Sequence, residues 1–284
     1  MTDSGRRNRG AIILTGPSSC GKGEVSKALR AELAIPAERC LAMGAILRET
    51  FAKAQSDAAF VADLEARHAI SDRLPIVDTP DMTDALRAKI AEHQSSLSEM
   101  LGSRAGHRAR PGDWRAATAL DWLEYCASHG LLVPNRWTQS LIAARLASLA
   151  QSPGLLILDG YPRTPAAAEH LLDVLAQAQI PVVKVLHLSI SKQEMLNRAA
   201  LRQRDDDDHE ALLKRYAFYV DSVQPSVDYM KDRLGSMCVA LIDAHQPEYD
   251  SSNGRRVLNL RRSVENVVRS CLATFPAWAL SSGA

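Results

Sequence analysis

A glycine-bearing segment near the N-terminus constrains the fold most. It reads Gly-Pro-Ser-Ser-Cys-Gly-Lys over residues 16–22, follows the apolar run 11–15 and precedes a helical pattern at 24–33. Glycines let a backbone wrap closely around phosphate oxygens, and the amides of a helix N-terminus add positive potential. This G-x-x-x-x-G-K pattern between strand and helix predicts a phosphate-binding loop, or P-loop, in which Lys22 reaches the terminal phosphates. The predicted nucleotide-binding residues here are Gly16, Ser18, Ser19, Cys20, Gly21, Lys22, Gly23 and Glu24.

Further apolar runs predict the rest of a sheet. They lie at 155–158, 182–190 and 239–242, and helical stretches separate them. Short apolar runs that alternate with helices are typical of buried parallel strands. We therefore expect an α/β fold with a doubly wound, five-stranded parallel sheet, in which ligands bind at the carboxyl ends of the strands.

The stretch 49–130 has a different pattern, with helices and loops but no convincing strand. Thr79 and Pro80 suit the start of a helix whose apolar face spans 82–101. The segment 103–113 carries arginines and little apolar content, which predicts an exposed loop. We interpret 49–130 as a helical insertion in the α/β core.

Composition and charge narrow the class of protein. Of 284 residues, 46% are hydrophobic and 24% are charged, and the formal net charge of +1 gives no overall basic field for nucleic acid. Five scattered cysteines without C-x-x-C spacing favour neither a zinc site nor disulfides. No apolar run reaches the roughly 18 residues of a membrane span. We expect a cytoplasmic monomer with no nucleic-acid or membrane partner and a disordered tail at 1–10.

An acidic residue and an arginine follow the second apolar run. Asp159 ends that run, so its carboxylate is expected at the carboxyl edge of the sheet beside the P-loop. Gly23 stands where many P-loops carry the hydroxyl that holds magnesium, which makes Asp159 the candidate metal ligand. Arg163 follows closely and is placed to hold a phosphate with two hydrogen bonds.

The hexapeptide Asp-Gly-Tyr-Pro-Arg-Thr at 159–164, together with the P-loop, resembles the adenylate kinase family of nucleoside monophosphate kinases. The segments 44–48 and 130–134 resemble two further blocks of that family, in the same order. The resemblance implies ATP as phosphoryl donor, Mg²⁺ as cofactor and a nucleoside monophosphate as acceptor. The acceptor-binding residues that it implies are Met43, Gly44, Arg48, Leu132, Val133, Gly160 and Arg163.

Downstream arginines resemble those that bracket the family's lid over ATP. Always-charged guanidinium groups can stabilise the oxygens that gain negative charge during phosphoryl transfer. Arg198 and Arg202 join the ATP-binding set, and the implied catalytic residues are Lys22, Arg163, Arg204 and Arg215. The expected organisation is a tail at 1–10, a core domain of 11–48, 131–196 and 216–284, an inserted acceptor-binding region at 49–130, and a short zinc-free lid at 197–215.

Departures from the family pattern leave the acceptor open. Glu24 replaces a usual threonine and is either a magnesium ligand, a helix-start residue or a mark of lost activity. Met43, Ala45 and Ala167 replace polar groups that usually meet the acceptor. We expect a phosphotransferase with AMP the best single acceptor; the alternatives are a P-loop kinase for another phosphorylated metabolite and an inactive nucleotide-sensing protein. The insertion either remakes the acceptor lid or is a surface or oligomer decoration.

Overall fold

The structure, a computed structural model, describes residues 9–79, 82–103, 113–129, 131–202, 209–252 and 255–280. The chain divides into two compact units, which we call the sheet unit (Met1–Met43 and Ala143–Ala284) and the helical unit (Gly44–Ile142). Several sequence-based expectations fall outside the described residues. They concern the tail at 1–8, Pro80, the loop at 104–112, Gly130, and the segment 203–208 with Arg204; the side chain of Arg202 is not described either.

The sheet unit is built on five parallel strands, as the sequence predicts, and their order in the sheet is β2-β3-β1-β4-β5. The strands are β1 (Gly10–Thr15), β2 (Cys40–Ala42), β3 (Leu155–Asp159), β4 (Val182–Ser189) and β5 (Val239–Asp243). In register, Leu14 of β1 lies opposite Asp159 of β3, and Thr15 lies opposite His187 of β4. The central strand β1 therefore delivers the chain into the P-loop between its two neighbours.

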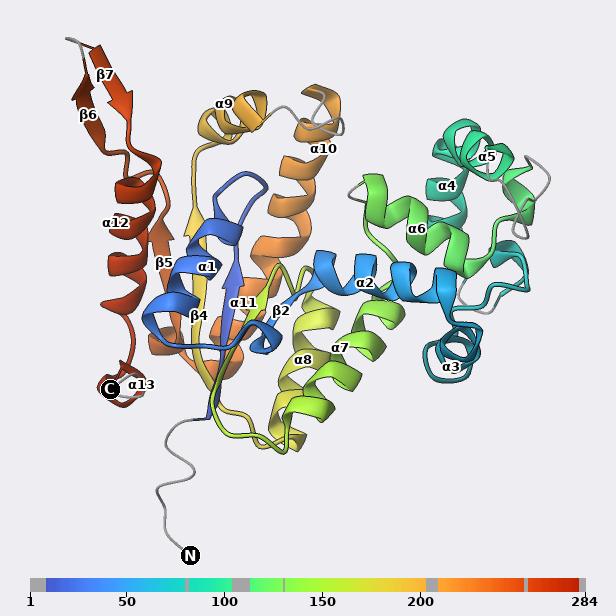
Figure 1. Ribbon diagram of the computed structural model, residues 1–284, viewed down its shortest axis with the longest axis horizontal. Coiled ribbons are helices and arrows are strands. Elements are labelled where there is room, and N and C mark those ends of the chain that lie inside the picture. The colour runs from blue at the N-terminus through green and yellow to red at the C-terminus, as the bar shows by residue number, and fades with distance from the viewer. Residues whose placement is uncertain are drawn as a thin grey trace, which may run out of the picture. The chain divides into compact units, whose positions relative to one another are not determined.

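Helices cover both faces of this sheet (Figure 1). Ile12 and Leu14 are buried in one cluster with residues of α1 (Lys22–Glu32) and α12 (Leu260–Leu272). Side chains alternate along a strand, so Ile13 is buried on the opposite face, where α8 (Pro165–Gln177) and α11 (Gln224–Leu234) pack together. Burial on both faces explains why the strands are almost wholly apolar.

The remaining elements of the sheet unit follow β4 and β5 or connect the strands. They are η2 (Ala37–Arg39), α9 (Lys192–Arg202), α10 (His209–Phe218), the π turn η5 (Tyr219–Val223), η6 (Ser236–Cys238), the hairpin of β6 (Tyr249–Ser252) and β7 (Arg255–Leu258), and α13 (Ala277–Leu280).

The start of the fold corrects the expected tail boundary. The strand β1 begins at Gly10, and Arg9 donates hydrogen bonds to the carbonyl oxygens of Ala150 and Ala178. These contacts fix residues 9 and 10 to the sheet unit, so they are not part of a disordered tail.

The helical unit contains the segment interpreted as an insertion. Its elements are α2 (Met43–Ser56), α3 (Ala58–His68), η3 (Ile76–Asp78), α4 (Asp84–Glu92), α5 (Gln94–Gly102), η4 (Trp114–Ala116), α6 (Ala119–His129) and α7 (Asn135–Leu149); α2 and α7 continue along the chain into the sheet unit. Trp122 and Tyr125 of α6 are fully buried. No helix in the described part of the chain is long and apolar enough to cross a membrane.

The helix expected from Thr79 to Gly102 is two helices, and its start was placed wrongly. Thr83 caps α4, because its hydroxyl oxygen accepts a hydrogen bond from the amide of Leu86 at 3.1 Å. Thr79 instead ends η3, and its hydroxyl donates to the carbonyl of Ile76. A break at His93 separates α4 from α5.

Candidate active site

The P-loop has a backbone that depends on its glycines. Gly16 has φ 145° and Gly21 has φ 90°, both outside the range that most side chains allow. A Cβ atom on Gly16 would also lie 2.4 Å from the carbonyl oxygen of Leu188. Helix α1 then begins at Lys22, and no side chain among the described residues caps its N-terminus. The amides of this helix start are therefore available for an anion.

Lys22 lies inside the loop that it is expected to serve. Its Nζ donates to the carbonyl oxygens of Gly16 and Pro17 at 2.9 and 2.7 Å and lies 3.6 Å from Cys20 Sγ. The ammonium group is thus held at the phosphate cradle by weak, neutral partners. A phosphate oxygen is a stronger, charged acceptor and can replace them.

Asp159 lies at the carboxyl end of β3, next to β1. Burial raises the pKa of its carboxyl group, while the positive charges of Lys22 and Arg163 act to lower it. These three charged groups therefore influence one another at the same edge of the sheet.

A magnesium ion fits this carboxylate. The described residues contain no group of three or more His, Cys, Asp or Glu side chains that could hold a metal by themselves. Mg²⁺ commonly takes one or two protein carboxylates and completes its shell with phosphate and water oxygens. Asp159 fits this mode of coordination. It is a single buried carboxylate beside the phosphate-binding loop, and burial disfavours its charge.

Arg163 is fixed by the turn that follows Asp159. Its Nε donates to the carbonyl oxygen of Gly160 at 2.8 Å, and a Cβ on Gly160 would lie 3.3 Å from its Nη2. Burial lowers the pKa of Arg163, the Asp159 carboxylate opposes this, and the charge of Arg215 on α10 lowers the pKa further. The positive charges of Arg163 and Arg215 therefore act on each other.

Glu24 lies on the exposed side of α1. Its Oε1 pairs with Lys27 Nζ at 2.9 Å, and both side chains are more than half exposed. A carboxylate in the first turn also suits the positive end of the helix. This geometry favours the helix-start interpretation of Glu24 over magnesium binding.

The expected acceptor residues are divided between the units. Met43 is buried and follows β2, whose Ala42 lies opposite Asp159. In the helical unit, Arg48 is exposed and its Nη1 lies 3.4 Å from where Gly44 would carry a Cβ. Leu132 and Val133 precede α7, and the carbonyl of Leu132 accepts a hydrogen bond from Cys126 Sγ at 3.7 Å.

Two residues beside the P-loop escaped the sequence analysis. Glu194 and His245 both contact Arg198, and Arg198 Nη1 lies 4.0 Å from the position of a Cβ on Gly21. The four-residue spacing of Glu194 and Arg198 on one helix was a usable signal. So was the place of His245 just after β5, at the carboxyl edge of the sheet.

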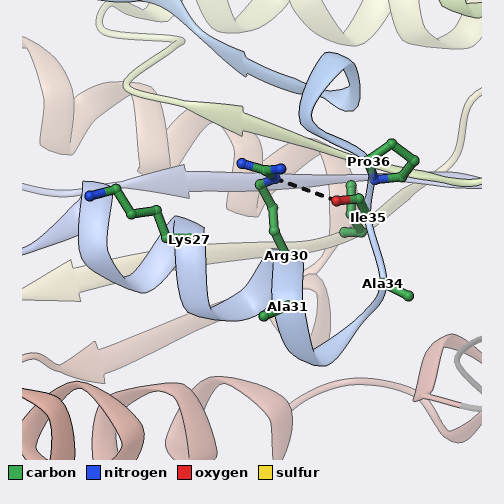
Figure 2. A pocket seen from close by; sticks show the side chains of 6 residues that line it. All are labelled: Lys27, Arg30, Ala31, Ala34, Ile35 and Pro36. Atoms are coloured by element: carbon green, nitrogen blue, oxygen red, sulfur yellow. Dashed lines mark hydrogen bonds between the residues drawn. The ribbon is translucent and has the colours of Figure 1, made fainter.

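A separate hollow lies near the C-terminal end of α1 (Figure 2). It has a volume of about 320 Å³ and is lined by Lys27, Arg30, Ala31, Ala34, Ile35 and Pro36. Arg30 Nε donates to the carbonyl of Ile35 at 3.4 Å across it. Because the P-loop is at the other end of α1, this hollow is not part of the candidate site.

The fold and the site define a class. A parallel sheet in this strand order, with a P-loop from β1 into α1 and a carboxylate at the end of β3, is that of a P-loop nucleotide-binding protein. Residues 117–234 match the family model of adenylate kinase. This matched segment contains Asp159, Arg163, Arg198 and Arg215, and over it the chain is similar to adenylate kinases.

Individual adenylate kinases are also similar to this chain in sequence. The adenylate kinase of Cyanothece sp. (strain PCC 7425 / ATCC 29141) is 37% identical over 125 residues, or 43% of this chain and 62% of that protein. That of Mycobacterium sp. (strain MCS) is 36% identical over 105 residues, or 37% and 58%. That of Mycobacterium tuberculosis (strain ATCC 25177 / H37Ra) is 34% identical over 105 residues, again 37% and 58%. The chain thus spans about three fifths of the length of these curated relatives.

Proposed function

We propose that this protein is an ATP-dependent nucleoside monophosphate kinase, which moves the γ-phosphoryl group of ATP reversibly onto a monophosphate, with AMP the first candidate. The observation that carries the proposal is the charged cluster at the carboxyl edge of the sheet. Lys22, Asp159 and Arg163 lie within electrostatic reach of one another there, and Arg215 acts on Arg163. In-line phosphoryl transfer needs such positioning and charge stabilisation more than it needs a general base.

Each group has a proposed task. Lys22 exchanges the carbonyl oxygens of Gly16 and Pro17 for the β- and γ-phosphates of ATP. An oxygen of the acceptor's phosphate forms a bond to the γ-phosphorus, while the bond to the β,γ-bridging oxygen breaks and its electron pair leaves with ADP. Arg163 and Arg215 stabilise the negative charge that spreads over the transferred group.

Asp159 is the residue that would hold Mg²⁺. When bound, the ion supplies charge neutralisation between the phosphate oxygens. The positive charges of Lys22 and Arg163 favour the ionised form of that carboxylate, against the larger effect of burial.

The other expectations enter the proposal unchanged. Arg198, Arg202 and Arg204 bind ATP or the transferred group from a short lid at 197–215. Met43, Gly44, Arg48, Leu132, Val133 and Gly160 bind the acceptor with the helical region 49–130. We further propose that the protein is a monomer and that it is cytoplasmic; the five free thiols support the reducing compartment.

A second candidate, a P-loop kinase for another phosphorylated metabolite, is favoured by one observation. Met43 and Ala167 stand where polar groups would meet an acceptor base, and both are buried apolar side chains. An acceptor pocket without such polar groups discriminates weakly between bases. The acceptor therefore has to be identified by experiment.

The test is a coupled assay with Mg-ATP and a panel of nucleoside monophosphates. We expect turnover on at least one, and a loss of about 100-fold or more in kcat/KM for Lys22→Ala. Lys27→Ala, on the exposed side of the same helix, is the matched control and should leave turnover unchanged. If ATP binds but no nucleotide accepts a phosphoryl group, the proposal is wrong and a sensor or the second candidate replaces it.

A further inference from the structure

A compact ionic network lies beside the P-loop on α9 and on the segment after β5. Arg198 Nε donates to Glu194 Oε1 at 2.6 Å, and His245 Nδ1 lies 3.0 Å from the same oxygen. Arg198 Nη2 donates to the carbonyl oxygen of Ala244 at 3.0 Å. One carboxylate oxygen thus ties together Arg198 and His245, which come from distant parts of the chain.

The network leaves one end of the guanidinium directed toward the P-loop. Its Nε and Nη2 atoms are engaged by Glu194 and Ala244, whereas Nη1 is the atom nearest to the Cβ position of Gly21, at 4.0 Å. Gly21 is the residue from which α1 begins. Contacts within the protein therefore orient Arg198 at the loop.

This pair differs from an ordinary pair on a helix surface. The side chains of Arg198 and Glu194 are 28% and 21% exposed, whereas those of Arg261 and Glu265, at the same spacing on α12, are 83% and 51% exposed. Burial acts to raise the pKa of Glu194, but the hydrogen bonds and charges of Arg198 and His245 outweigh it and lower the pKa. Exposed pairs contribute little, so a partly buried Arg198–Glu194 pair that also contacts the exposed His245 has to be explained by more than surface charge.

We infer that Glu194 and His245 are positioning residues that hold the Arg198 guanidinium beside the P-loop for the donor nucleotide. This inference rests on the proposed function. His245 is itself fixed, because its amide donates to Asp243 Oδ1 at 2.8 Å. A guanidinium that is already oriented loses less conformational entropy when ATP binds, so the network acts on ATP affinity.

A purely structural role would give different results. If the network only joined α9 to the end of β5, its loss would lower the melting temperature and affect both substrates. A positioning role predicts a higher KM for ATP, with kcat and the KM for the acceptor little changed.

The experiment uses the whole chain given by the sequence and four variants: Glu194→Ala, Glu194→Gln, His245→Gln and the matched control Glu265→Ala. We expect Glu194→Ala to weaken ATP binding about ten-fold by calorimetry without acceptor, which is the loss of one charge-assisted hydrogen bond. Glu194→Gln should recover part of the affinity, since its amide oxygen still accepts from Arg198. His245→Gln should have a smaller effect in the same direction, and Glu265→Ala none.

Calorimetry separates this inference from the proposed function. If the protein binds ATP but transfers nothing, the proposed function fails while the positioning role is still decided by the ATP affinities. Unchanged affinity in Glu194→Ala overturns the inference, as does a loss that Glu265→Ala reproduces or that only follows a lower melting temperature. No ATP binding by the unchanged protein overturns both.

Discussion

At the scale of single residues, Asp159 is held in an environment that disfavours its charge. Burial raises its pKa and only Lys22 and Arg163 oppose this, so the folded state binds a proton more readily than the unfolded chain does. Protonated Asp159 therefore contributes stability at low pH. This contribution is lost as the pH rises from the ordinary pKa of an unfolded aspartate through the raised pKa of folded Asp159. At neutral pH the ionised form of Asp159 therefore costs stability.

We predict that Asp159→Asn is more stable and less active than the unchanged protein. Removing the buried charge should raise the free energy of unfolding at pH 7 by about 1 kcal/mol, or the melting temperature by about 2 °C. The kcat in Mg-ATP should fall about 100-fold. Thermal unfolding and the coupled assay measure the two effects, and a variant that loses stability along with activity would contradict this explanation.

Arg163 gives a second prediction at this scale. Arg163→Ala should lower kcat about 100-fold, because the guanidinium meets the transferred or acceptor phosphate, while ATP affinity changes by no more than about two-fold. The control is Arg233→Ala, which removes an exposed arginine of α11. A parallel loss of ATP affinity would place Arg163 on the donor side and disprove its assigned role.

How far the sequence predicts these residues depends on distance along the chain. Lys22 and Asp159 could be placed because each lies within a few residues of a strand that fixes its position. Glu194 and His245 are about fifty residues apart, and only the parallel order of β4 and β5 brings them together. A contact between residues so far apart in the chain leaves no local pattern in the sequence.

At the scale of elements, the π turn η5 joins helix α10 to helix α11. Its first residue, Tyr219, lies with its hydroxyl 2.8 Å from Nε2 of His187 on β4, and Gln224 Nε2 donates to the same hydroxyl at 3.4 Å. Burial raises the pKa of Tyr219, which favours the protonated form of its hydroxyl group. Burial lowers the pKa of His187, with Asp228 opposing and Lys22 adding to the effect.

This buried histidine predicts a pH dependence of stability. Unfolded histidine takes up its proton near pH 6.5 but folded His187 does so only at lower pH, so protonation favours unfolding in the interval below 6.5. We expect stability to fall from pH 7.5 to 5.5, and to fall less in His187→Gln, which cannot titrate. Denaturant titrations at both pH values test this.

The control for that experiment is His209→Gln, since His209 is exposed at the start of α10. It should keep the full pH dependence. His68 and His170, whose pKa values burial also lowers, account for the part that His187→Gln retains. If the free energy of unfolding changed equally with pH in all three proteins, His187 would not be a cause of the pH dependence.

There are physical reasons why the sequence misses one strand and places the start of one helix wrongly. The strand β2 spans only Cys40–Ala42 and is too short to show a periodic pattern. In the helical unit, both Thr79 and Thr83 can cap a helix, and only the hydrogen bond to Leu86 shows that Thr83 does so. A longer apolar segment such as β1 could be interpreted only as a strand.

At the scale of the molecule, the family match covers part of the chain and the P-loop lies outside it, at residues 16–23. The parallel sheet could be predicted because its pattern is repeated several times. The role of the helical unit could not, since an apolar helix face predicts burial but not what the unit binds.

The whole protein should be stabilised by the nucleotide that it binds. ATP at 100 times its dissociation constant should raise the free energy of unfolding by about 2.7 kcal/mol, because it binds the folded state alone. Lys22→Ala should abolish most of this gain, whereas Lys27→Ala should keep it. An equal shift in all three proteins would mean that ATP binds away from the P-loop.

The central claim is that the P-loop and the cluster of Lys22, Asp159 and Arg163 transfer a phosphoryl group from ATP to a monophosphate. The most direct measurement follows γ-labelled ATP in a single turnover with AMP, and with the other monophosphates in turn. We expect the label to appear in the β-position of the newly formed nucleoside diphosphate, and Lys22→Ala to prevent this transfer. Label that stays in ATP, or appears only as inorganic phosphate, would contradict the proposed phosphoryl transfer.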